Sequence, residues 1–201
     1  FDSLAARGLL FTNFYATCFR TDQGIVAVLS SFPAQPATAI IKDFGKFENL
    51  PNLVTAVGQP GYHTSFYYGA DLSYANTATY LISAGISYLA GVNEVPHTRK
   101  TDWGAYDEDL FSFYISDSLP RPEPFLTVML TLTNHEYFDA DVDKVFNRKE
   151  KNNGYLNTAY YTDKCIAKFI REASTKEWYR NTIFIITSDH AHILPLGRSY
   201  N

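Results

Sequence analysis

A carboxylate and two imidazoles follow one apolar segment near the end of the chain. Residues 182–187 form a continuous run rich in β-branched residues, and Ser188-Asp189-His190-Ala191-His192 comes directly after it. Such a run predicts a strand buried on both faces, and open α/β sheets bind ligands beyond the carboxyl ends of their strands. Asp189 and His190 offer an oxygen and a nitrogen donor, which suits zinc or manganese better than calcium. The alternative is a capped strand end with a hydrogen-bonded histidine.

A second candidate is a hydroxyl at a predicted helix start. Residues 9–16 predict a strand, and residues 21–31 predict a helix that begins with Thr21 and Asp22, both good N-terminal residues. A hydroxyl at this position faces unpaired backbone N–H groups and the positive end of the helix dipole, so an incoming phosphate would be held beside it. The alternative is that Thr21 only caps its helix.

A third candidate follows residues 125–132, a second uniformly apolar strand that ends at Thr133-Asn134-His135-Glu136. A histidine beside an asparagine can bind an anionic oxygen or give a proton to a leaving group, and a purely structural histidine is the alternative. If the sheet is parallel, its strands end at the same edge. We therefore expect Thr21, His135 and Asp189 to share one site.

The order of elements predicts an α/β fold, with a mostly parallel central sheet and helices on both of its faces. A further strand is expected at residues 63–68, and a loop at residues 139–153. Helices are expected at residues 1–8, 21–31, 49–57, 74–84, 107–119 and 155–174.

Composition narrows the class of protein. The chain has 201 residues, 46% of them hydrophobic, which is enough for one globular domain with a sizeable core. Its formal charge of -4 comes without a basic stripe, so no nucleic-acid partner is expected. No apolar run approaches the length of a membrane span.

Cys18 and Cys165 lack metal-ligand spacing, and two buried thiols are favoured over a disulfide. His63 and His97 have no strand-end context and are expected to be ordinary surface or structural residues.

Two common enzyme classes lack their sequence signatures. The chain contains no Gly-x-Ser-x-Gly elbow, which argues against a Ser-His-Asp hydrolase of the α/β type. It also contains no glycine-rich loop of the P-loop or dinucleotide-binding type.

Taken in order, the motifs resemble the lipoteichoic acid synthase and phosphoglycerol transferase branch of the alkaline phosphatase/sulfatase superfamily. The resemblance covers essentially the whole chain. Each motif is weak by itself, and the resemblance is specific because the motifs occur together in this order. It rests on residues 1–16, Arg20-Thr21-Asp22-Gln23-Gly24, and residues 29–34, 61–69, 103–108, 134–136 and 181–190. It implies an alkaline phosphatase/sulfatase-like catalytic domain, and residues 1–201 are expected to be a single partial domain that is truncated at both ends.

The resemblance also implies roles for single residues. Thr21 stands where the family has a threonine nucleophile that also touches the metal. The Asp-His metal pair matches Asp189 and His190, and His192 is a further candidate ligand. His135 matches a histidine that holds the substrate head group, and Arg20 is expected to bind substrate with it. The expected cofactor is a divalent cation, manganese first, with zinc or magnesium as alternatives. The cation would lower the pKa of the hydroxyl, and a phospho-threonine intermediate would form.

The implied function is that of a metal-dependent phosphotransferase or phosphodiesterase, acting on phosphoglycerol-type or related phospholipid head groups. The parent protein is expected to be anchored in the cell membrane, with its catalytic domain outside the cytoplasm; no oligomeric state is predicted. The sequence departs from the family in three places. The family's glutamate ligand precedes the nucleophile and is not in this chain, Ala191 replaces a glycine, and no substrate-side arginine stands near Gly69-Ala70.

Two other functions remain open from the sequence. Sulfatases oxidise a cysteine or serine in a Cys-x-Pro-x-Arg signature, and Cys18 is followed by neither the proline nor the arginine at that spacing. A sulfate ester hydrolase is therefore the lesser alternative. A catalytically inactive relative that binds head groups or glycans is the other. Phosphoethanolamine transferases also use a threonine, but their catalytic domains tend to be rich in disulfides, which two cysteines do not support.

Overall fold

Three parallel strands form the centre of the protein. The structure is a computed structural model that describes residues 1–58, 61–116, 122–147 and 151–194. Strand β1 (His63–Tyr68) lies in the middle and pairs with β2 (Tyr88–Ala90) on one side and β3 (Phe125–Leu130) on the other. The predicted α/β fold with a parallel sheet is confirmed.

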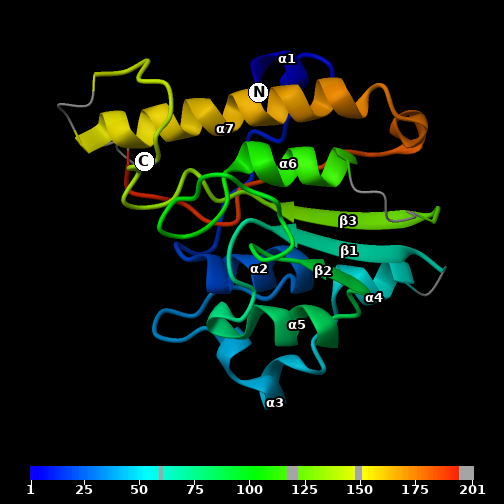
Figure 1. The fold of residues 1–201 in the computed structure, drawn as a ribbon. Helices are drawn as coiled ribbons and strands as arrows, with labels where there is room; N and C mark the ends of the chain where they lie inside the picture. Colours follow the sequence, from blue (N-terminus) through cyan, green and yellow to red (C-terminus); the bar gives the residue numbers. More distant parts are fainter. Residues whose placement is uncertain (59–60, 117–121, 148–150, 195–201) are drawn as a thin grey trace.

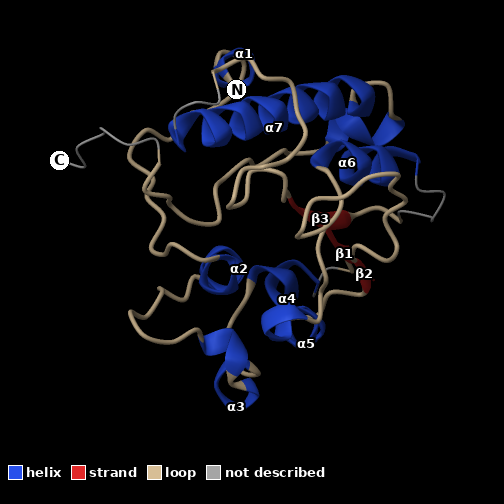
Figure 2. Cartoon of the chain, turned by 60° about the vertical axis from the view of Figure 1, so that its left-hand side comes forward, coloured by secondary structure: helices blue, strands red, loops and turns tan. Residues whose placement is uncertain are grey.

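Helices cover both faces of this sheet. The long helix α7 (Lys151–Ala173) and α6 (Asp107–Ser116) lie on one face, while α2 (Thr21–Ser30), α4 (Leu53–Gly58) and α5 (Thr77–Ser83) lie on the other (Figures 1 and 2). The remaining helical segments are short: α1 (Asp2–Ala5), α3 (Phe44–Phe47), and the 3-10 turns Ile40–Lys42, Tyr74–Asn76 and Glu177–Asn181.

The central strand serves both cores because successive side chains of a strand point to opposite faces. Phe66 and Tyr68 pack into the core that contains α2, with Ile25 and Leu29 among its members. Tyr67 packs into the core made by β2, α6 and α7. β1 therefore fixes the position of α2 relative to the other half of the molecule.

Several predicted elements are found with shifted bounds. Residues 63–68 match β1 in full, and α2 ends one residue earlier than predicted. Helix α4 begins at Leu53 because the side chain of Asn52 accepts the backbone N–H of Thr55 at 2.8 Å, which caps the helix there. Helix α7 begins four residues before the predicted start at residue 155, and β3 ends at Leu130. Residues 117–119 of the predicted helix 107–119, and residues 148–150 of the predicted loop, lie outside the described residues.

Two predicted strands are wrong. Residues 9–16 and 182–187 are not paired as strands, because the ladders within the described residues join β1 only to β2 and β3. Their apolar side chains are exposed instead: Leu9 is 89% exposed, Ile183 89% and Ile185 82%. An apolar run predicts burial, but a strand forms only where another strand supplies its hydrogen bonds. Conversely, β2 was not predicted, since three residues are too few for a periodic signal.

A buried carboxylate joins β3 to the helices on its face. Asp107, the first residue of α6, is fully buried. Its Oδ1 accepts the backbone N–H groups of Leu132 and Thr133 at 2.7 and 3.0 Å, and its Oδ2 accepts the hydroxyl of Thr162 on α7 at 2.6 Å. The backbone N–H of Asp107 in turn donates to the hydroxyl of Thr133 at 2.9 Å. The chain after β3 therefore has a fixed course.

Replacing this carboxylate tests its importance for the fold. Asp107→Ala should lower the free energy of unfolding by about 3 kcal/mol or more, because it leaves two buried backbone N–H groups and the half-buried Thr162 hydroxyl without their acceptor. Asp107→Asn keeps one oxygen and should cost about 1 kcal/mol. Urea denaturation measures both. The control is Asp143→Asn, which breaks only an exposed ion pair with Lys164 and should cost less than about 1 kcal/mol. Equal stability of Asp107→Ala and the control would contradict this account.

Candidate functional site

Thr21 is the first residue of α2. The residue before it, Arg20, is the N-cap, with extended backbone angles (φ -145°, ψ 143°), and its side chain makes no cap hydrogen bond. Thr21 is therefore not the N-cap of α2, which was the alternative role considered from the sequence. The N-cap residue thus makes no side-chain bond to the positive end of α2, where the half-buried Thr21 lies.

The first turn of α2 is in direct contact with the Asp189 segment. A β-carbon built on Gly24 would lie 2.5 Å from the carbonyl oxygen of Asp189 and 3.0 Å from its β-carbon. Only a residue without a side chain permits such an approach. The helix end that carries Thr21 is thus packed beside Asp189, although neither residues 9–16 nor residues 182–187 form the strand that was predicted.

Cys18 strengthens the same contact from the loop before α2. Its Sγ donates to the carbonyl oxygen of Asp189 at 3.3 Å, and the backbone N–H of Ala191 donates to the Cys18 carbonyl at 3.1 Å. Burial raises the pKa of the Cys18 thiol above its ordinary value, and the charges of Asp189 and Asp22 add to this, while the backbone N–H of Arg20 acts against it. The thiol is therefore protonated at neutral pH and available as a donor. Both cysteines are free and buried, as expected for thiols.

Asp189 and His190 present two donor atoms to one point. His190 Nε2 lies 3.7 Å from Asp189 Oδ2, and His190 Nδ1 lies 2.8 Å from the carbonyl oxygen of Ala191. Because a carbonyl only accepts, Nδ1 carries the hydrogen and Nε2 keeps its lone pair. A histidine that ligates a metal is oriented in this way.

The spacing of these atoms also fits a cation. Two ligand atoms that each lie about 2.1 Å from a tetrahedral metal are about 3.4 Å apart. The distance of 3.7 Å between His190 Nε2 and Asp189 Oδ2 is close to this value. In the part of the chain that the structure describes, no three His, Cys, Asp or Glu side chains gather as a metal site. Asp189 and His190 could thus supply two ligands of a metal site, which needs further donors such as the Thr21 hydroxyl.

The third predicted strand end approaches the same segment through Glu136. His135 Nδ1 lies 2.7 Å from the carbonyl oxygen of Glu136, and the Glu136 carboxylate is 3.6 Å from His192 Nε2. The ring of His192 stacks on Tyr155 at 5.7 Å, and its Nδ1 accepts the backbone N–H of Leu194 at 3.0 Å. His192 therefore faces Glu136 and the aromatic rings, and its predicted role as a metal ligand stays a prediction.

The side chain of Asn134, next to His135, forms a hydrogen bond that ties this turn to α7. Its side-chain oxygen accepts the hydroxyl of the fully buried Thr158 on α7 at 2.7 Å. Together with Asp107, this bond fixes the turn that carries His135. Figure 1 shows the loops that follow β1, β2 and β3 at one end of the sheet, where the C-terminal segment also lies.

Two cations lie beside a buried carboxylate at the start of α2. Asp22 is buried, and its carboxylate has Arg20 Nε at 3.4 Å and Lys42 Nζ at 3.2 Å. Arg20 and Lys42 exceed Asp22 by one positive charge, which the Asp189 carboxylate beside Gly24 offsets, and the positive end of the helix dipole remains. This environment attracts an anionic group such as a phosphate.

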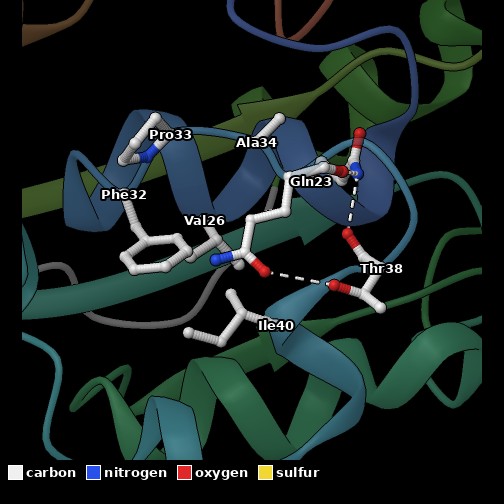
Figure 3. A pocket seen from close by; sticks show the side chains of 8 residues that line it. Gln23, Val26, Phe32, Pro33, Ala34, Thr38 and Ile40 are labelled. Carbon is white, nitrogen blue, oxygen red and sulfur yellow. Dashed lines mark hydrogen bonds between the residues drawn. The ribbon is translucent and has the colours of Figure 1, made fainter.

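Gln23 holds the loop after α2. Its side-chain amide donates to the carbonyl oxygens of Gln35 and Thr38 at 2.8 and 2.9 Å. A pocket beside the helix is lined by Gln23, Val26, Phe32, Pro33, Ala34, Gln35, Thr38 and Ile40 (Figure 3). None of the predicted site residues lines it, so we assign it no part in the chemistry.

Tyr68 lies near the candidate site and was not among the residues predicted for it. It is the last residue of β1, and burial raises the pKa of its phenol, to which the charges of Asp189 and Tyr74 add. The phenol is therefore a hydrogen-bond donor at neutral pH, within range of the Asp189 charge. The available signal was its position at the carboxyl end of a predicted strand, which is where open α/β sheets bind ligands.

The chain matches the sulfatase family over residues 1–199. It is 30% identical over 144 residues to phosphoglycerol transferase I of Escherichia coli O139:H28, an alignment that covers 65% of this chain and 19% of that protein. The chain thus spans about a fifth of the length of the curated relatives it matches.

Solved structures show the same fold at low identity. Lipoteichoic acid synthase LtaP from Listeria monocytogenes has a TM-score of 0.69 at 17% identity, over 82% of this chain and 43% of that chain. Streptococcus pyogenes phosphoglycerol transferase GacH, in complex with sn-glycerol-1-phosphate, has 0.64 at 16%, over 88% and 51%. The C-terminal periplasmic domain of EcEptC from Escherichia coli, in complex with Zn, has 0.57 at 20%, over 85% and 51%.

The chain belongs to the sulfatase family. The predicted resemblance to the lipoteichoic acid synthase and phosphoglycerol transferase branch of the alkaline phosphatase superfamily is confirmed. The predicted enzyme class, a transferase or hydrolase of this superfamily, follows from the family. The division into a single partial domain stays a prediction.

The contact between α2 and Asp189 can be tested by adding one methyl group. Gly24→Ala should lower the free energy of unfolding by about 1–3 kcal/mol, because its β-carbon overlaps the Asp189 backbone. The control is Gly45→Ala in α3, where the nearest atom would be 3.7 Å away. That change should be neutral or stabilising by up to about 1 kcal/mol, since alanine favours a helix. If urea denaturation gives Gly24→Ala the stability of the control, the contact is not as close as described.

Proposed function

We propose that the chain carries the nucleophile of a metal-dependent phosphotransferase or phosphodiesterase, and that Thr21 is this nucleophile. The observation that carries the proposal is the packing of Gly24 against the Asp189 backbone, which brings the positive end of α2 beside an Asp-His pair. A hydroxyl, a positive helix end and two metal-type donors are what the transfer of a phosphoryl group requires.

The substrate class we propose is a phosphoglycerol-type or related phospholipid head group. Support comes from the relatives, which are phosphoglycerol transferases, and from the similar fold of GacH, which was solved with sn-glycerol-1-phosphate. The positive charge of Arg20 and Lys42 at the start of α2 suits the anionic group of such a substrate. We assign Arg20 and His135 to substrate binding.

The reaction would proceed in two steps. The Thr21 oxygen attacks phosphorus and releases its proton to solvent, an O–P bond forms, and the bond from phosphorus to the leaving alkoxide breaks. The leaving oxygen takes a proton, which His135 can supply from its ring. An acceptor hydroxyl or water then attacks the phosphorus held on Thr21 and gives its proton to the same histidine. The bond from phosphorus to the Thr21 oxygen breaks, and that oxygen takes a proton from solvent. The positive end of α2 stabilises the charge on the phosphoryl oxygens.

Asp189, His190 and the Thr21 hydroxyl would hold the cation, with manganese proposed first and zinc as the main alternative. When bound, it would lower the pKa of the hydroxyl and screen the phosphate charge. The orientation of His190, with Nδ1 on a backbone carbonyl, supports its part in this set. The complex of EcEptC with Zn supports a divalent cation on this fold.

We further propose that the full-length protein is anchored in the cell membrane with this domain outside the cytoplasm. The EcEptC domain of similar fold is periplasmic, which supports that location. Among the described residues, no helix has the length and apolar character to cross a bilayer.

Separate variants of Thr21 and Cys18 distinguish phosphate from sulfate chemistry. Thr21→Ala in the full-length protein should abolish turnover of a chromogenic phosphodiester, because the attacking oxygen is lost. Cys18→Ala should lower it by less than about 5-fold, since an S–H group is a weak donor and one hydrogen bond contributes about 1 kcal/mol. A chromogenic sulfate ester is assayed in parallel. Sulfatase activity that depends on Cys18 would replace the proposal by the sulfate ester alternative.

Metal content separates the roles of the histidines. His190→Ala or Asp189→Asn should remove the bound metal from the full-length protein, because each removes a ligand, which should exceed the roughly 10- to 100-fold effect of an outer-shell change. His135→Ala should keep the metal and lower turnover by about 10²- to 10⁴-fold, the range for a general acid or base. His63→Ala, at the opposite end of β1, is the control for both measurements. Unchanged metal stoichiometry in His190→Ala and Asp189→Asn would reject the metal site.

A further inference from the structure

Trp103 lies in a turn that is fixed against the end of β1. The hydroxyl of Thr101 accepts the backbone N–H groups of Trp103 and Gly104, both at 3.2 Å. A β-carbon at Gly104 (φ +150°) would overlap the carbonyl oxygen of Gly69, and the next residue, Ala105, donates its N–H to that same oxygen at 2.9 Å. The turn therefore has little freedom, and its one large side chain is that of Trp103.

The Trp103 side chain reaches the turn after β3. Its indole N–H donates to the carbonyl oxygen of Glu136 at 2.6 Å. Its ring also lies against the His135 ring, with centroids 4.3 Å apart and planes tilted by 44°. Trp103 thus contacts both the imidazole and the carbonyl to which that imidazole is bonded.

The shared carbonyl sets the state of the histidine. The Glu136 oxygen has two lone pairs; the indole N–H uses one, and His135 Nδ1, at 2.7 Å, takes the other. A carbonyl cannot donate, so Nδ1 must carry the hydrogen. His135 Nε2 is then the nitrogen left for a ligand, as an acceptor in the neutral ring and as a donor in the protonated one.

We infer that Trp103 is a positioning residue, which holds His135 in the Nδ1–H tautomer with Nε2 directed to the substrate. This inference rests on the role of His135 in the proposed function. Trp103 does not touch the reacting atoms; it acts by fixing the carbonyl that orients the imidazole and by supporting one face of the ring. From the sequence, Trp103 was part of the motif 103–108 that carries the family resemblance, but no role followed for it, because a single aromatic residue in a loop has no periodicity.

A double-mutant cycle in the full-length protein tests the inference. Trp103→Phe keeps an aromatic ring and loses the N–H, so kcat for a chromogenic phosphodiester should fall by about 5-fold, the effect of one hydrogen bond, with KM changed by less than about 2-fold. In the His135→Ala background the same change should have no further effect, because the group on which Trp103 acts is gone. The matched control is Trp178→Phe. Trp178 packs against Phe125, at the opposite end of β3, and its change should leave kcat unaltered.

A second readout does not depend on activity. In ¹⁵N-histidine NMR spectra, His135 should show the Nδ1–H tautomer, and Trp103→Phe should shift it toward a mixture of tautomers while Trp178→Phe does not. An unchanged His135 spectrum in Trp103→Phe, or equal loss of kcat in the presence and absence of His135, would overturn the role of Trp103 alone. Full turnover by His135→Ala would overturn the role of His135, and that of Trp103 with it.

Discussion

The buried carboxylate of Asp107 is the interaction on which the arrangement of the protein depends. It takes two backbone N–H groups just beyond β3 and a hydroxyl from α7, and it does so without exposure to solvent. A buried carboxylate is costly unless its oxygens are satisfied, so the three donors and the carboxylate require each other. Because β3, α6 and α7 meet at this point, the turn that carries His135 leaves the sheet in one direction.

The other half of the site depends on a close approach and not on a charge. Gly24 lets α2 rest on the Asp189 backbone, and Cys18 adds hydrogen bonds to the same segment. Since Ile25 and Leu29 of α2 share one core with Phe66 of β1, the central strand helps to set the position of Thr21. The two halves meet where Glu136 approaches His192. Chain segments far apart in sequence are therefore joined by a few short contacts at one end of the sheet.

The sequence predicted the elements whose formation depends on residues close together in the chain. The β1 strand and the α2 start follow from periodicity and helix-start residues, and the position of His135 beyond β3 follows from an apolar run that stops at polar groups. Pairing could not be predicted for residues 9–16 and 182–187, because an apolar run does not show which strand lies beside it. Asp107 looked like an ordinary acid in a first helical turn, since its partners are distant in sequence. Gly24 did give a signal: a glycine inside a helix often marks a close approach.

The most direct test of the account is to identify the residue that becomes phosphorylated. The full-length protein would be incubated with a phosphodiester substrate and manganese, quenched in acid, digested and examined by mass spectrometry. The account predicts a phosphoryl-linked group on the peptide that contains Thr21, at Thr21 itself, and its absence when the Thr21 hydroxyl is removed. Modification at another residue, such as Cys18 or His135, with Thr21 unmodified during turnover, would contradict it.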